Sequence, residues 1–304
     1  MTMFAAVNIA LALVLSPLLL GVINRTKAVV AGRKGQPLLQ TYYDLWKLMH
    51  KGAAISRTTS WIFIAGPATG AAAAFTAALF MPCGTVPAVF SFQGDLIVFA
   101  YLFGLARFFT ILAALDTGSA FEGMGASREA AYSAMAEPAL LLALAALARE
   151  AGSASLAGIY GQYGAAHWST SGPTLVLAIA AMFVVLLAEN CRIPVDDPTT
   201  HLELTMIHEV MVLDHGGVDF AFITWSASLK LWLFGSLIVG IMLPAGATPP
   251  ESLALRVGGM LGLAVAVGIT ESMMARLRLV RVPQLLTGAG ALALLALMLS
   301  FSMR

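Results

Sequence analysis

Long apolar runs are the feature that most constrains the fold of this 304-residue chain. A helix needs about 20 mostly apolar residues to cross a bilayer. Eight windows reach or approach that length, at 3–23, 61–81, 95–115, 131–148, 173–188, 220–243, 255–274 and 284–301. Only 11% of the residues are charged, whereas soluble domains carry about 25%. The sequence therefore predicts an all-α polytopic membrane protein, folded as a single transmembrane domain over residues 1–304.

The polar segment between the first two predicted spans contains a helical pattern of its own. Leu38, Tyr42, Leu45 and Met49 recur there at helical spacing, between lysine and arginine residues. That spacing is typical of a short amphipathic helix that lies on a membrane surface.

A second polar segment, DTGSAFEGMGASREA at residues 116–130, separates the third and fourth predicted spans. Its glycines, among them Gly123 and Gly125, indicate a flexible loop. We therefore expect the fourth span to begin only at residue 131.

Basic residues predict the orientation of the chain. With the N-terminus outside, the cytoplasmic segments hold twelve of them: Arg25, Lys27, Arg33, Lys34, Lys47, Lys51, Arg57, Arg128, Arg192, Arg276, Arg278 and Arg281. The external segments hold three: Arg149, Arg256 and Arg304. Because cytoplasmic loops of membrane proteins are enriched in lysine and arginine, we expect an external N-terminus. The polar segments at 24–60, 116–130 and 189–209 are then all cytoplasmic.

The stretch 189–209, ENCRIPVDDPTTHLELTMIHE, concentrates charge directly after an apolar run. Its ionisable residues are Glu189, Arg192, Asp196, Asp197, His201, Glu203, His208 and Glu209. Two of the acids also have a structural interpretation. Asp197 before Pro198 fits a helix N-cap, and Glu203 three residues after Thr200 fits a capping box.

Residue types and spacings exclude most catalytic and metal chemistry in this chain. His201 and His208 are seven residues apart and lack a third partner, so we predict no metal site and expect these histidines to relay protons instead. Cys83 and Cys191 lack the spacing that an iron–sulfur cluster or structural zinc requires. No nucleotide-binding or hydrolase motif is present, and the net charge of +1 indicates no nucleic-acid partner. We expect no cofactor in this chain.

Charged residues inside apolar spans are costly and are therefore functional candidates. Glu137 lies in the fourth span and is followed by Pro138. A proline in a helix frees a backbone carbonyl and bends the chain, and such a bend can place the carboxylate against water or a partner base. We therefore expect Glu137 to take part in proton transfer. Arg107 in the third span and Lys230 in the sixth are suitable counter-charges for such an acid.

Glu189 and Glu271 each have two interpretations. Glu189 is either an interfacial ion-pair partner of Arg192 or a protonatable acid at the mouth of an ion path. Glu271 is either a helix-end anchor near Arg276 and Arg278 or a member of the same path. The predicted proton path consists of Glu137, Glu189, Arg107, Lys230, Glu271, His201, His208 and Glu209.

The stretch ENCRIPVDDPTTHLELTMIHE closely resembles the signature of the formate hydrogenlyase subunit 4 family. These are membrane subunits of energy-converting (group 4) nickel–iron hydrogenases, related to subunit 1 of respiratory complex I. GRKGQPLLQTYYDLWKL and FEGMGASREAAYSAMAEPAL resemble the family's first two cytoplasmic loops. The resemblance covers essentially the whole chain, including the eight-span layout with an external N-terminus.

The resemblance implies a cofactor-free subunit of the cell (inner) membrane beneath a hydrophilic hydrogenase module. Its loops would dock the small iron–sulfur subunit and the large nickel–iron subunit, so the nickel–iron centre and iron–sulfur clusters are expected in these partners. Its buried acids and bases would couple electron transfer to proton or sodium movement through antiporter-like membrane subunits. The predicted docking residues are Asp44, Glu122, Arg128, Arg192, Asp196, Asp197 and Glu203.

One departure from the complex I pattern bears on the partner. Complex I subunits carry an FDLPEAE-type run where this chain has VDDPTTHLE, at residues 195–203. This difference favours a hydrogenase-type partner over quinone binding. Two alternatives stay open: a complex-I-like subunit that lines a quinone chamber, and a stand-alone ion transporter.

Overall fold

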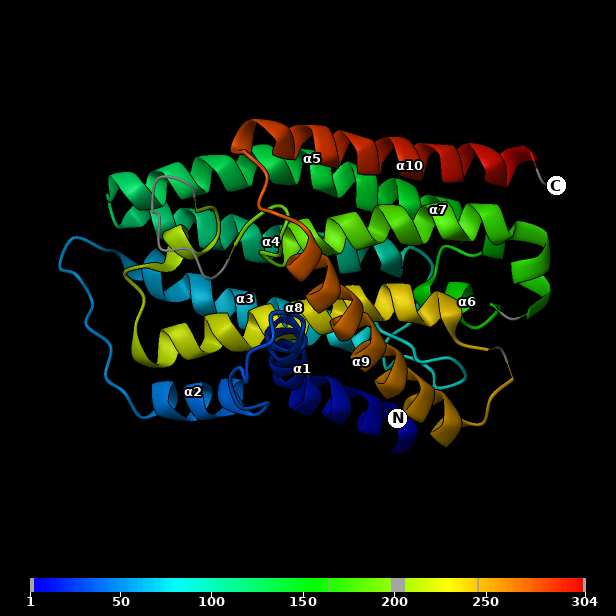
Figure 1. Cartoon of the computed structure of the whole chain (residues 1–304), viewed down its shortest axis with the longest axis horizontal. Coiled ribbons are helices and arrows are strands. Elements are labelled where there is room, and N and C mark those ends of the chain that lie inside the picture. The colour runs from blue at the N-terminus through cyan, green and yellow to red at the C-terminus, as the bar shows by residue number, and fades with distance from the viewer. Residues whose placement is uncertain (1–2, 164, 198–205, 245, 303–304) are drawn as a thin grey trace.

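The computed structural model describes residues 3–163, 165–197, 206–244 and 246–302 (Figure 1). Eight helices in this part of the chain are long and apolar enough to cross a membrane. They are α1 (Met3–Val30), α3 (Trp61–Leu79), α4 (Asp95–Asp116), α5 (Ala120–Ala151), α7 (Ala165–Glu189), α8 (Gly217–Met242), α9 (Pro249–Met273) and α10 (Val282–Ser302). The prediction of an all-α polytopic membrane protein with eight spans is confirmed.

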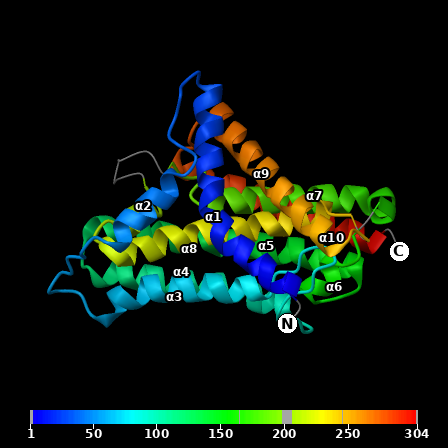
Figure 2. The same ribbon diagram turned by 90° about the horizontal axis from the view of Figure 1, so that it is seen from below.

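The spanning helices do not all run in one direction. Helices α3, α4, α5, α7, α8 and α10 follow the long axis of the molecule, whereas α1 and α9 cross them obliquely (Figures 1 and 2). Helix α10 packs against α5 and α7, α3 packs against α4 and α8, and α1 packs against α9 and α8. Small residues permit this close packing. At Gly66 in α3, for example, an added Cβ would lie 2.8 Å from the Cβ of Ala113 in α4.

Four short helices complete the described fold: α2 (Gln40–Met49), α6 (Leu156–Tyr160), and the 3-10 helices η1 (Glu209–Val212) and η2 (Leu279–Arg281). Helix α2 confirms the short helix predicted after the first span, and none of its residues is buried. It packs against α1 and α8, and the Tyr42 hydroxyl donates a hydrogen bond to the Val14 carbonyl. Large apolar side chains such as Trp46, which is 71% exposed, therefore lie on its outer surface.

The prediction of a loop at residues 116–130, before the fourth span, is wrong for most of that segment. Helix α5 begins at Ala120 and continues for 32 residues, because alanine, glutamate, methionine and arginine in this segment favour helix. Gly125 lies inside that helix and permits a close contact rather than flexibility. An added Cβ there would lie 2.9 Å from both the Ile207 carbonyl oxygen and the Met211 Cγ.

The three polar segments meet at one end of the bundle, which we call the charged end. Ser60 donates hydrogen bonds from its backbone N–H and its hydroxyl to the Asp116 carboxylate, at 2.6 and 2.9 Å. Arg128 in α5 donates to the Met206 carbonyl at 2.8 Å. At the opposite end the connecting loops bond to one another, for instance through the Ser91 and Ser155 hydroxyls at 2.9 Å.

Candidate functional site

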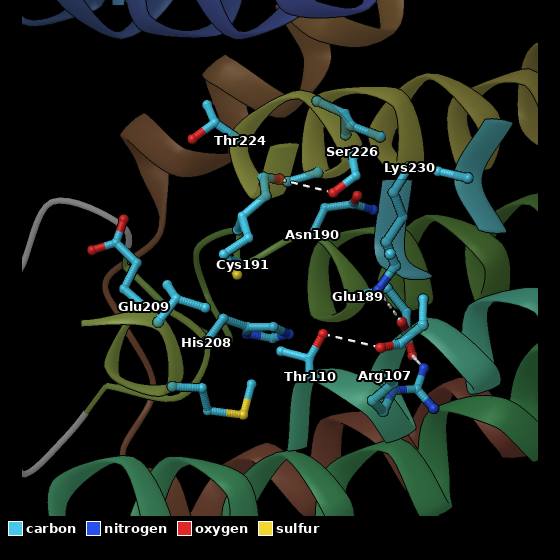
Figure 3. Close-up of a pocket in the computed structure, with 18 of the residues that line it drawn as sticks. Arg107, Thr110, Glu189, Asn190, Cys191, His208, Glu209, Thr224, Ser226 and Lys230 are labelled. Carbon is cyan, nitrogen blue, oxygen red and sulfur yellow. Dashed lines mark hydrogen bonds and ion pairs between the residues drawn. The ribbon is translucent and has the colours of Figure 1, made fainter. Parts of the chain in front are cut away.

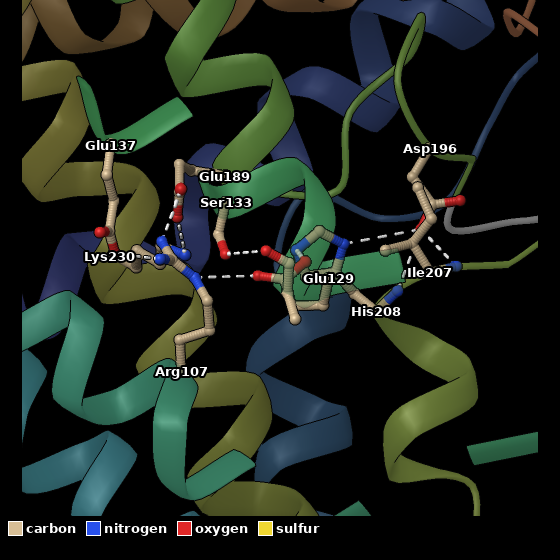
Figure 4. Close-up of polar contacts among 10 residues, drawn as sticks. Arg107, Glu129, Ser133, Glu137, Glu189, Asp196, Ile207, His208 and Lys230 are labelled. Carbon is tan, nitrogen blue, oxygen red and sulfur yellow. Dashed lines mark hydrogen bonds and ion pairs between the residues drawn. The ribbon is translucent and has the colours of Figure 1, made fainter. Parts of the chain in front are cut away.

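Arg107 in α4 is the centre of a buried charge network near the charged end (Figure 4). Its guanidinium lies 3.0 Å from Glu129 of α5 and 2.6 Å from Glu189 of α7. It also pairs with Glu137, which lies about two helical turns beyond Glu129 on α5. A guanidinium presents five donors in a planar fork, so one arginine can hold three carboxylates that come from different helices.

Lys230 of α8 extends the network on the other side of Glu189. Its ammonium lies 2.6 Å from Glu189 Oε2, whereas Arg107 contacts Glu189 Oε1. The Glu189 side chain is 4% exposed, so both contacts form away from solvent. Three carboxylates share two cations here. The two cations thus hold carboxylates of α5 and α7 against α4 and α8.

His208 continues the network toward the charged end (Figure 4). Its Nε2 lies 3.1 Å from Glu129 Oε2, and its Nδ1 lies 3.7 Å from Asp196 Oδ2. Asp196 in turn pairs with Arg276 at 3.0 Å. Burial alone would lower the pKa of His208, but Cys191 and the carboxylates of Glu129 and Asp196 raise it well above its usual range.

Asp196 organises the segment that carries His208. Its Oδ2 accepts hydrogen bonds from the backbone N–H groups of Ile207 and His208, each at 3.2 Å. Burial would raise the pKa of Asp196, but hydrogen bonds from His208 and the charge of Arg276 hold that pKa below its usual value. This buried carboxylate therefore fixes where the chain returns toward the bundle after α7.

A cavity of about 280 Å³ lies beside the network (Figure 3). Its charged and polar lining includes Arg107, Glu129, Glu189, His208, Glu209 and Lys230. Apolar residues of α1, α3, α4 and α8, such as Leu20, Phe103 and Phe220, form other parts of the wall. The cavity therefore brings charged groups of the network together with apolar surface.

Glu271 belongs to a second buried cluster. It lies 2.8 Å from Lys27 of α1 and 3.4 Å from Arg192, and its side chain has no exposed surface. Within the described residues, Arg192 thus pairs with Glu271, while Glu189 pairs with Arg107 and Lys230. Glu189 and Arg192 are therefore close in the sequence but belong to different buried clusters.

The predicted docking residues differ in exposure. Asp44 is exposed on α2, and its carboxylate accepts a hydrogen bond from Gln40 at 2.9 Å. Arg128 and Asp197 are half-buried. In contrast, three of the predicted docking side chains lie inside the protein: Glu122, Arg192 and Asp196. The Glu122 carboxylate has no exposed surface and accepts a hydrogen bond from the Asp214 N–H at 3.1 Å.

Two predicted site residues, His201 and Glu203, lie outside the described part of the chain. One network member, Glu129, was not among the predicted site residues, because the predicted fourth span began two residues after it. It is 5% exposed. Alanine, glutamate, methionine and arginine recur between residue 120 and Glu137 in spite of Gly123 and Gly125, and this helix-favouring composition is the signal that would have found Glu129.

Comparison with known proteins places these features in a family. The family described as NADH dehydrogenase matches residues 2–301. Formate hydrogenlyase subunit 4 of Escherichia coli (strain K12) is 33% identical over 294 residues, which cover 92% of each chain. Hydrogenase-4 component C of the same organism is 33% identical over 254 residues, covering 84% of this chain and 79% of its own.

Two further relatives are more distant. An NADH-quinone oxidoreductase subunit of Rubrobacter xylanophilus is 28% identical over 224 residues, covering 70% of this chain and 63% of its own. A chain in the structure of the membrane-bound sulfane sulfur reductase, an archaeal respiratory membrane complex, superposes with a TM-score of 0.84. It is 21% identical and covers 98% of both chains, which shows a shared fold.

Proposed function

We propose a function from the premise that this chain belongs to the NADH dehydrogenase family, together with the formate hydrogenlyase and hydrogenase-4 membrane subunits. The resemblance to the formate hydrogenlyase subunit 4 family is thereby confirmed. The chain is a multi-pass membrane protein and a membrane subunit of a complex I-like complex. Its specific partners and its coupling role are the subject of the proposal.

In this proposal the chain is the membrane anchor and coupling subunit of an energy-converting nickel–iron hydrogenase or formate hydrogenlyase complex. It lies in the cell inner membrane with its N-terminus outside, and the charged end docks the small iron–sulfur and large nickel–iron subunits. The nickel–iron centre and the iron–sulfur clusters belong to those partners. Two curated relatives whose names refer to formate hydrogenlyase and hydrogenase-4 support this assignment.

The observation that carries the coupling role is the buried network around Arg107. It joins carboxylates of α5 and α7 to Lys230 of α8 and reaches His208 at the charged end. Two unit charges about 4 Å apart interact by about 4 kcal/mol at an effective dielectric constant of about 20. A charge change at the charged end is therefore large enough to move a proton between neighbouring carboxylates, since about 1.4 kcal/mol corresponds to a tenfold change in proton affinity.

Glu137 provides the proposed exit from the network. Its side chain is 39% exposed, whereas those of Glu129 and Glu189 are 7% and 4% exposed. A small side pocket lined by Tyr101, Leu141 and Phe234 adjoins it. In the proposed mechanism, a proton passes across Arg107 to Glu137, which faces an adjacent antiporter-like membrane subunit.

The first experiment identifies the partners. We expect a tag on this chain to co-purify nickel–iron and iron–sulfur subunits from native membranes. Purification of the intact membrane complex without either partner would overturn the hydrogenase assignment.

The second experiment tests coupling with Glu189→Gln, which keeps the shape of the side chain and removes its charge. The complex should assemble, and its ion-coupled turnover should fall on the order of 10²-fold, as for loss of a proton-transfer group. Unchanged turnover and unchanged ion movement would remove Glu189 from the path.

The cavity favours a second candidate function, a complex-I-like subunit that lines a quinone chamber. Its volume of about 280 Å³ is near the lower limit of about 300 Å³ for ligand pockets, and one relative is named as an NADH-quinone oxidoreductase subunit. Labelling of Phe220 or Phe103 by a photoreactive quinone, abolished by excess quinone, would favour this candidate. The alternative of a stand-alone ion transporter requires ion flux by the purified chain in liposomes.

A further inference from the structure

Three chemically different metal-binding side chains gather where the chain leaves α7. Cys191, Asp196 and His208 each bring one ligand atom into a group whose members lie within 4.8 Å of one another. Figure 3 shows the Cys191 sulfur close to the His208 ring, and Figure 4 shows the Asp196 carboxylate facing that ring. Thiolate, imidazole and carboxylate are the donors that zinc takes in proteins.

We propose that Cys191, Asp196 and His208 form a binding site for a divalent transition-metal ion of the zinc type. The ligand atoms are Cys191 Sγ, His208 Nδ1 and Asp196 Oδ2. With three protein ligands, a tetrahedral ion keeps a fourth position for water. Cys191 and His208 also line the cavity of about 280 Å³, so water and ions have a route to the site.

The separation between the imidazole and carboxylate ligand atoms fits an ion held between them. Ligands about 2.1 Å from a tetrahedral ion lie about 3.4 Å from one another. His208 Nδ1 and Asp196 Oδ2 are 3.7 Å apart, which is close to that value and too long for a hydrogen bond. Within the described residues the buried Nδ1 atom makes no hydrogen bond, and its neighbour Asp196 Oδ2 is far enough away for an ion to lie between them.

The surroundings orient both the carboxylate and the imidazole. Asp196 Oδ1 accepts hydrogen bonds from Arg276 at 3.0 Å and from the Asp197 N–H at 2.9 Å. These bonds fix the carboxylate with Oδ2 toward the ring. On the far side of the ring, Glu129 Oε2 lies 3.1 Å from Nε2. Metal-bound imidazoles commonly contact a carboxylate through their second nitrogen, and their carboxylate neighbours are themselves hydrogen-bonded.

The backbone at Cys191 supplies a separate argument. Cys191 has a φ of 52°, the one positive φ among the non-glycine residues that the structure describes. Its position just after α7 is one where glycine or asparagine is favoured, because a left-handed backbone is unfavourable for a residue with a Cβ. Cysteine is therefore not required by the backbone here, which directs attention to its side chain.

Cobalt(II) is a direct probe of this site, because a thiolate ligand produces a charge-transfer absorption that imidazole and carboxylate ligands do not. The full-length chain, purified alone in detergent and stripped with a chelator, is titrated with Co²⁺ at neutral pH. We expect one Co²⁺ per chain with the thiolate band, displaced by Zn²⁺. Cys191→Ser should abolish the band and weaken Co²⁺ binding at least about tenfold.

Cys83→Ser is the matched control, because Cys83 is the only cysteine in the chain besides Cys191. It lies at the opposite end of the bundle, where its thiol contacts the Ser252 carbonyl. This variant should keep both the band and the affinity. Loss of the band in Cys83→Ser, or its absence from the unaltered chain, would overturn the proposal.

X-ray absorption at the zinc edge tests the unaltered chain without any substitution. We expect one sulfur ligand at about 2.3 Å beside nitrogen and oxygen ligands at about 2.0–2.2 Å. A bound zinc ion with nitrogen and oxygen ligands alone would exclude Cys191 and overturn the assignment. Metal binding by the isolated chain is independent of the proposed hydrogenase function, so the two proposals fail separately.

Discussion

Two buried arginines show how differently this fold uses the same side chain. Arg107 in α4 and Arg256 in α9 are 9% and 2% exposed. Arg107 contacts three carboxylates, whereas Arg256 donates to the neutral side-chain oxygen of Asn8 at 2.7 Å. In the described ranges of the chain, no ion pair includes Arg256.

The neighbours of each arginine decide its role. In the proposed coupling role, the carboxylates that share Arg107 exchange a proton, which would give this network more than one charge distribution. Asn8 has no proton to exchange, and its NH₂ group donates to the Met81 carbonyl at 3.1 Å. Arg256 and Asn8 thus tie α9, α1 and the loop after α3 together. Burial of a charge alone does not identify an ion path.

Substituting each arginine by methionine tests this comparison and has the largest expected effect. Arg107→Met removes the cation that Glu129, Glu137 and Glu189 share, which should lower the free energy of unfolding by about 3–5 kcal/mol. Arg256→Met leaves one buried amide oxygen unpaired, which should lower the free energy of unfolding by about 1–3 kcal/mol. It also removes a buried charge. Thermal unfolding of the chain in detergent compares the two. A greater loss for Arg256→Met would reverse the assignment of roles.

The same comparison predicts a difference between two glutamates of α5. Glu137→Gln should reduce ion-coupled turnover of the assembled complex on the order of 10²-fold, because it removes the exit group. Glu150, near the other end of α5, accepts a hydrogen bond from Ser171 at 2.8 Å. Glu150→Gln should leave coupling within about twofold. Similar turnover in both variants would contradict the exit role.

Two glycines of α5 test whether the His208 segment depends on close packing. Gly125→Ala pushes against Ile207 and Met211, and such overpacking costs about 1–3 kcal/mol. At Gly123 an added Cβ meets no atom within 4 Å. Gly123→Ala should therefore stabilise α5 by about 0.5–1 kcal/mol. Melting temperatures in detergent should move in opposite directions, and equal shifts would argue against the contact.

The smallest expected effects concern docking at the charged end. Asp44→Ala and Arg128→Ala should weaken retention of the peripheral subunits by about 1 kcal/mol each, most visibly as faster loss at high salt. Glu251, exposed at the opposite end, is the control. Glu251→Gln keeps its capping box with Thr248 and should not alter subunit retention. If Asp44→Ala and Arg128→Ala also leave the retention of the peripheral subunits unchanged, the docking surface lies elsewhere.

The spans and their charged residues were accessible to sequence reasoning, because a bilayer requires long apolar runs in which each charge is conspicuous. Arg107, Glu137, Glu189 and Lys230 were found in this way, and the structure brings them together. Glu129 was missed because α5 continues beyond its apolar part into polar but helix-favouring sequence. Apolar content measures contact with lipid, whereas helix length also depends on propensity and packing.

Pairings across the fold were not accessible in the same way. The pairing of Glu271 with Lys27 and Arg192 requires α1, α9 and the segment after α7 to meet. The prediction of no metal site considered the spacing of His201 and His208, whereas the proposed ligands come together only when Asp196 binds the N–H groups of Ile207 and His208. Separation along the chain gives no direct information on such contacts.

Glu189 touches a different helix with each of its oxygens. Oε1 contacts Arg107 of α4, and Oε2 contacts Lys230 of α8, while the carboxylate itself ends α7. A proton on this group removes the charge that attracts both cations, so the attachments to α4 and α8 weaken together. At this junction, protonation of a single side chain would therefore loosen three membrane helices from one another at once.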